Sequence, residues 1–176
     1  MKQALHKAEL LGLQKVTAST LVNIGNIFAA LFNYEEAIKN YERVLNNYYT
    51  ELQPISVGIT YYNLGNAYLL INKGEEAERY FKKALDLGKQ LKHKLLVSRV
   101  YFELSKIYMD NKDLETAIAY SFEAEKNYPS KGASRPGLDA YLANLCELNL
   151  LREEYENAIK YGEEAIGRGH IKSNTS

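Results

Sequence analysis

Apolar and small residues recur at helical spacing on both sides of a short polar break within residues 58–87. Before the break, Tyr61, Leu64 and Tyr68 lie three or four residues apart, so they share one face of a helix. After the break, a second series with the same spacing runs from Ala77 to Leu85. The pattern predicts two helices that pack against each other as a hairpin.

The same pattern recurs along the chain at shifts of 40, 40 and 41 residues. The first helix of each copy has a small residue at the point where a partner helix can approach closely, and the second helix opens its packing face with alanine. These positions are Gly25, Gly65, Ser105 and Cys146 in the first helices, and Ala37, Ala77, Ala117 and Ala158 in the second helices. A fixed period of this length indicates a repeat architecture. We therefore predict an all-α solenoid of stacked antiparallel helical hairpins.

The repeat period sets the expected boundaries. We predict one solenoid over residues 1–170, in which residues 1–15 form the second helix of an incomplete repeat. Complete repeats are expected at residues 18–50, 57–92, 95–128 and 138–168, and a frayed tail at residues 169–176. Two prolines, two glycines and two serines in YPSKGASRPGL predict a loop before the fourth repeat.

The segments YYNLGNAY and AERYFKKAL resemble the tetratricopeptide repeat family, whose repeats carry a large residue, Leu-Gly and Tyr, followed by Ala, Phe and Ala. The resemblance implies a right-handed superhelix with a concave groove lined by the first helices. Repeats near 40 residues, longer than the usual ~34, resemble those of bacterial peptide-pheromone receptors and sensory domains of signalling proteins. It follows that the chain is expected to be a fragment or regulatory domain of a larger signalling protein.

Composition removes several function classes. Lysines and arginines number 22, as do aspartates and glutamates, so the formal net charge is zero and a basic nucleic-acid binder is not expected. No apolar leader or membrane-length apolar run is present, which predicts a cytoplasmic protein. The three histidines lie far apart without nearby ligands, and no catalytic motif is present, so we predict no metal, no cofactor and no enzymatic activity. Cys146 is expected to be an inert, buried small residue.

Charge is unevenly distributed despite the zero sum. Residues 82–106 contain seven Lys or Arg and two acids, whereas residues 139–166 contain seven acids and two basic residues. The simpler interpretation is that these are ordinary solvated helix faces. The functional interpretation is that an acidic ligand is drawn to the second and third hairpins.

Positions offset by about one residue from the packing face of each first helix are expected to point into the groove. The candidate peptide-binding residues are Asn26, Tyr62, Asn66, Leu69, Arg99, Phe102, Lys106 and Met109. Asparagine amides can bond a peptide main chain, and Lys106 with Arg99 can receive a carboxylate. Replacing both Asn26 and Asn66 by alanine is expected to weaken binding without loss of stability. Alternatively, the repeated asparagines are inherited without function.

The groove residues resemble the carboxylate clamp of the family, but Val22 and Phe102 stand where that clamp has lysines. A different peptide is therefore expected, bound by a scaffold that does no chemistry. An alternative is an architectural module that forms a homodimer through its terminal repeats, since Leu5, Leu10 and neighbouring leucines lack a partner helix. A third possibility is the regulatory domain of a truncated enzyme.

Overall fold

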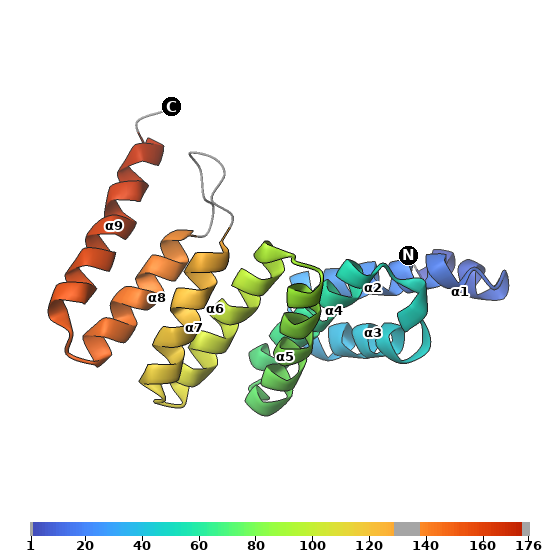
Figure 1. Ribbon diagram of the computed structural model, residues 1–176. Coiled ribbons are helices and arrows are strands. Elements are labelled where there is room, and N and C mark those ends of the chain that lie inside the picture. The colour runs from blue at the N-terminus through green and yellow to red at the C-terminus, as the bar shows by residue number, and fades with distance from the viewer. Residues whose placement is uncertain (1, 129–137, 174–176) are drawn as a thin grey trace. The chain divides into compact units, whose positions relative to one another are not determined.

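The computed structural model describes residues 2–128 and 138–173, with side chains described over 3–128 and 139–166. Within those ranges the regular structure is helical throughout (Figure 1). The elements are α1 (Lys2–Leu10), α2 (Gln14–Ala30), α3 (Tyr34–Asn47), η1 (Tyr49–Glu51), α4 (Pro54–Leu70), α5 (Gly74–Gln90), α6 (Lys94–Asp110), α7 (Leu114–Asn127), α8 (Leu138–Leu151) and α9 (Tyr155–Ser173). The chain divides into two compact units, Met1–Leu96 (unit 1) and Val97–Ser176 (unit 2). The prediction of an all-α solenoid of helical hairpins is confirmed.

The first helices of the four repeats end in the same way. One residue after the last turn adopts a left-handed backbone conformation. The N–H of this residue and the N–H of the residue after it each donate a hydrogen bond to a carbonyl of the final turn. These residues are Phe32 (φ 59°), Asn72 (φ 60°), Lys112 (φ 64°) and Glu153 (φ 62°). Their spacing reproduces the period of the sequence, so each repeat reverses the chain at an equivalent turn.

Close contact between glycine and an aromatic ring holds the hairpins of unit 1 together. A Cβ atom on Gly25 would lie 2.5 Å from the ring of Tyr41, and one on Gly65 would lie 2.7 Å from the ring of Phe81. Both rings are fully or almost fully buried. Ala37 in the first turn of α3 and Ala77 in the first turn of α5 are fully buried as well. The small residues predicted at the helix contacts are therefore required by packing.

The corresponding contact in unit 2 is made by small polar residues. Ser105 on α6 and Ser121 on α7 occupy the positions of the glycine and the ring. The Ser121 hydroxyl donates to Oδ1 of the buried Asn144 on α8, and the Ser105 hydroxyl shares its proton between this oxygen, at 3.1 Å, and the carbonyl of Phe102, at 2.8 Å. Asn144 thereby ties one repeat to the next. In the following repeat the positions hold Cys146, which is half-buried, and Gly162, where an added Cβ would lie 3.5 Å from the sulfur.

Several helix boundaries differ from the sequence-based expectation. α1 ends at Leu10, where the first segment was predicted to reach residue 15, and α4 begins at Pro54, where the second repeat was predicted to begin at residue 57. α9 continues to Ser173, so the tail predicted to fray from residue 169 is helical over its first part. Glycines near residue 168 lower helix propensity, but they do not remove a backbone hydrogen bond as proline would. α2 begins at Gln14, before the predicted start at residue 18. Of the loop predicted at residues 128–138, residues 129–137 lie outside the described part of the chain, as do residues 174–176.

Candidate functional site

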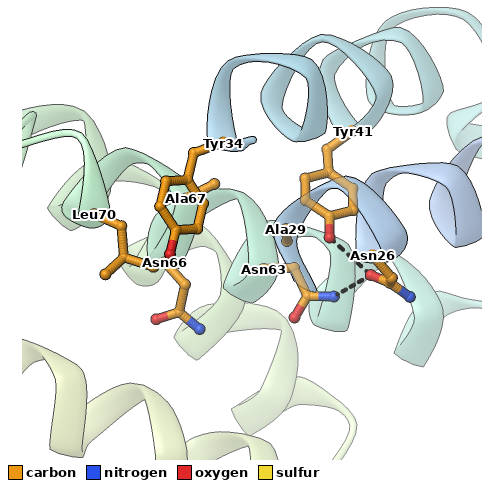
Figure 2. A pocket seen from close by; sticks show the side chains of 8 residues that line it. All are labelled: Asn26, Ala29, Tyr34, Tyr41, Asn63, Asn66, Ala67 and Leu70. Atoms are coloured by element: carbon orange, nitrogen blue, oxygen red, sulfur yellow. Dashed lines mark hydrogen bonds between the residues drawn. The ribbon is translucent and has the colours of Figure 1, made fainter. Parts of the chain in front are cut away.

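A pocket of about 300 Å³ lies within unit 1, where α2, α3 and α4 meet (Figure 2). Each of the three helices contributes part of its wall. The lining residues are Asn26 and Ala29 from α2, Tyr34 and Tyr41 from α3, and Asn63, Asn66, Ala67 and Leu70 from α4. The lining combines three carboxamides, two phenols and three apolar side chains, and it contains no charged group.

Two hydrogen bonds fix one wall of the pocket. The Oδ1 atom of Asn26 accepts from the hydroxyl of Tyr41 at 2.7 Å and from Nδ2 of Asn63 at 3.0 Å, as the dashed lines in Figure 2 show. Tyr41 is only 1% exposed, so its hydroxyl depends on this acceptor. The network joins the two helices of the first repeat to the first helix of the second repeat.

Burial raises the pKa of Tyr41 to about 12, while the neighbouring carboxamide of Asn63 acts in the opposite direction. The phenol therefore stays protonated at neutral pH and remains a donor. With both donors directed at its oxygen, Asn26 is held in one orientation. Asn26 is therefore a structural residue as well as a pocket residue, and these contacts predict, against the sequence-based expectation, that its replacement lowers stability.

Several polar atoms that line the pocket take no part in this network. Over the described residues, Nδ2 of Asn26 and Oδ1 of Asn63 have no partner, and the carboxamide of Asn66 has none at either atom. The hydroxyl of Tyr34 is likewise unbonded there. The pocket thus presents donors and acceptors of an uncharged kind on a wall that is already ordered.

Of the candidates predicted in unit 1, Asn26 and Asn66 line the pocket, whereas Tyr62 and Leu69 are not among its lining residues. The ring of Tyr62 packs against Phe81, with centroids 6.0 Å apart. Sequence analysis missed Asn63, Tyr34 and Leu70. The spacing of Asn63 and Asn66, three residues apart on one helix, places them on a common face and was the available signal.

The candidates predicted in unit 2 make contacts of their own. The ring of Phe102 packs against Tyr141 in a tilted arrangement, with centroids 4.4 Å apart. The ammonium group of Lys106 pairs with the carboxylate of Glu103 at 3.0 Å and lies over the ring of Phe102. Met109 packs against the cluster around Ala117. Arg99 is exposed. Lys106 is therefore already paired with a carboxylate of its own helix.

Asn26 and Asn66 belong to unit 1, whereas Lys106 belongs to unit 2. That these residues form one continuous row in a groove remains a prediction. In the ranges with described side chains, no three His, Cys, Asp or Glu residues gather in a way that could hold a metal ion. Among the described helices, none has the length and apolar content needed to cross a bilayer.

The sequence profile described as "Tetratricopeptide repeat" matches residues 16–90 and 56–130, and the chain belongs to this family. Such repeats indicate a scaffold for protein–protein interaction, and proteins of this kind are generally non-catalytic. No curated protein matches the chain.

Solved structures with the same fold include three proteins of low sequence identity. BtubC (BKLC) from P. vanneervenii is 16% identical with a TM-score of 0.81, over 93% of this chain and 67% of that one. MamA is 17% identical with a TM-score of 0.74, over 97% and 88% of the two chains. Pseudomonas aeruginosa pilF is 22% identical with a TM-score of 0.64, over 84% and 59%. At these identities the similarity establishes the fold.

Proposed function

We propose that the chain binds an extended peptide segment of a partner protein, and that the pocket of unit 1 holds the main chain of that segment. The observation that supports this most is the set of three asparagine carboxamides in one pocket, with free donors and acceptors beside an ordered network. An extended peptide carries main-chain N–H and C=O groups that need partners. A carboxamide can donate to one and accept from another without regard to side-chain identity.

The order already present in the pocket favours binding. Asn26 and Asn63 are held by hydrogen bonds before any ligand arrives, so less side-chain freedom is lost on association. Ala29 and Ala67 are small, so a main chain can approach the carboxamides closely between them. A signalling role, a cytoplasmic location and an acidic ligand at Arg99 and Lys106 remain predictions.

The test begins with a phage-displayed library of random linear peptides selected on the wild-type protein. A peptide enriched in this way is titrated calorimetrically against wild type and Asn66→Ala. We expect a loss of about 1–3 kcal/mol in binding free energy, because a main-chain group of the peptide would be left without its partner. The melting temperature should stay the same or rise slightly, since Asn66 makes no hydrogen bond within the described residues and alanine is the better helix former.

Asn23→Ala is the matched control. Asn23 occupies the same repeat position as Asn63 but is exposed and lies outside the pocket, so its removal should leave affinity unchanged. A peptide that binds Asn66→Ala as tightly as wild type would contradict the proposal.

A second candidate function is self-association through the exposed leucines at the C-terminal end of α1. Leu10 is 73% exposed and Leu11 61% exposed, a costly arrangement for adjacent large apolar side chains. Wild type and the double variant Leu10→Glu with Leu11→Glu can be compared by analytical ultracentrifugation. A wild-type dimer that the variant dissociates supports this function, and a monomer in both cases excludes it.

A further inference from the structure

Phe32 stands out among the four equivalent turns that end the first helices. Its counterparts Asn72, Lys112 and Glu153 are polar, whereas Phe32 has a bulky aromatic ring in the same left-handed conformation. This conformation is unfavourable for side chains with a Cβ atom, and asparagine tolerates it best. Phe32 is also 78% exposed, the highest value among the large hydrophobic side chains in the described part of the chain.

This exposed ring adjoins the pocket of unit 1. Its centroid lies 6.4 Å from that of Tyr34 in an edge-to-face arrangement, and Tyr34 lines the pocket. Leu70, which also lines the pocket, is 58% exposed. We call apolar rim the set of Tyr34 and Leu70, which line the pocket, and Phe32, whose ring contacts Tyr34. The pocket lining itself contains no charged side chain.

We infer that the partner of this pocket is an uncharged peptide segment with an apolar side chain that packs on the rim formed by Phe32, Tyr34 and Leu70. The inference rests on the proposed function and specifies its ligand class. An apolar side chain covering Phe32 would remove the ring from water, which offsets the unfavourable placement of phenylalanine in this turn. A carboxylate inside the pocket would lose hydration and meet no cation there, so acidic segments are disfavoured.

The experiment uses the same phage-displayed library, selected on the full chain, and the variant Phe32→Asn. This substitution installs the residue found at Asn72, so the melting temperature should stay the same or rise. Affinity for the enriched peptide should fall about tenfold, the loss typical of removing an aromatic anchor from an interface. A structural role for Phe32 alone would lower both quantities.

Lys112→Asn provides the matched control, because it places the same residue in the equivalent turn of unit 2. Its affinity for the peptide should equal that of wild type. Enriched peptides that depend on Asn66 should carry Leu, Ile, Phe or Tyr and contain fewer Asp and Glu residues than the starting library.

The possible failures can be told apart. A peptide that depends on Asn66 but binds Phe32→Asn as tightly as wild type overturns the inference and leaves the proposed function standing. Asn66-dependent peptides rich in Asp or Glu overturn the uncharged ligand class in the same way. If no peptide is enriched, or if the enriched peptides do not depend on Asn66, both the inference and the proposed function are wrong.

Discussion

The hydrogen bonds of Asn26 predict that its replacement destabilises unit 1. In Asn26→Ala, the hydroxyl of Tyr41 loses its acceptor at 2.7 Å and Nδ2 of Asn63 loses its acceptor at 3.0 Å. The Tyr41 side chain is only 1% exposed, so its hydroxyl has little contact with water in the folded protein. Leaving a buried donor unsatisfied costs about 1–3 kcal/mol.

Helix propensity works against this loss but is smaller. Alanine is favoured over asparagine in a helix interior by less than about 0.7 kcal/mol. The net destabilisation should therefore remain on the order of 1–2 kcal/mol. For a chain of this size each 1 kcal/mol shifts the melting temperature by roughly 2–4 °C. Thermal and urea unfolding followed by circular dichroism measure both quantities.

A double-mutant cycle with Tyr41→Phe isolates the hydrogen bond. Once the hydroxyl is gone, loss of Asn26 no longer leaves a buried donor without a partner. The double variant should then be more stable than the sum of the single effects predicts, with a coupling energy of about 0.5–3 kcal/mol. Asn23→Ala on the same helix is the control, and it should melt at or slightly above the wild-type temperature because its exposed side chain makes no hydrogen bond within the described residues.

Additive effects in this cycle would refute the reasoning, as would an Asn26→Ala protein that melts with wild type. Either result would mean that the Tyr41 hydroxyl finds another acceptor without cost.

Three further measurements test other parts of the structure. Gly65→Ala should lower stability by about 1–3 kcal/mol in urea unfolding, because the new methyl group would lie 2.7 Å from a buried ring; Gly74→Ala, which has open space, should raise it by about 0.5–1 kcal/mol, and equal effects would contradict the packing. Tyr41 keeps its proton up to a pKa of about 12 when folded but ionises near 10.0 when unfolded, so its contribution to stability is complete below pH 10 and declines as pH rises toward 12. The free energy of unfolding, measured as a function of pH, should decline less steeply over that range in Tyr41→Phe than in wild type. Parallel curves would show that folding does not raise the pKa of this phenol. Asn144→Leu should destabilise unit 2 by about 1–3 kcal/mol, and adding Ser121→Ala should restore part of the loss, since a hydroxyl without an acceptor is then removed.

Helices and hairpin turns were predictable because their signals are local. Spacing of three and four residues identified the packing faces, and the contacts at Gly25 and Gly65 confirm the close approach that the sequence indicated. The helix that became α9 was predicted to end too early, because the loss of an apolar pattern does not by itself end a helix. Of the residues that line the pocket, Asn26 and Asn66 were predicted from their repeat period.

The remaining pocket residues could not be identified in this way. Leu70 lines the pocket where Leu69 was expected, and one residue along a helix changes the direction of a side chain by about 100°. Repeat position alone does not fix that direction to within one residue, because helices of neighbouring repeats pack with their own small rotations.

The sequence alone determined that this chain is a series of helical hairpins, because helix periodicity, small contact residues and turn residues act over a few positions. Only the tertiary structure decided which asparagines line the pocket and form hydrogen bonds between helices. Asn23 and Asn63 hold the same place in successive repeats, yet Asn63 donates to Asn26 and lines a pocket, whereas Asn23 is exposed. The difference arises from the neighbouring repeat, since a hydrogen bond across 37 residues depends on where two helices meet and not on the local pattern of either one.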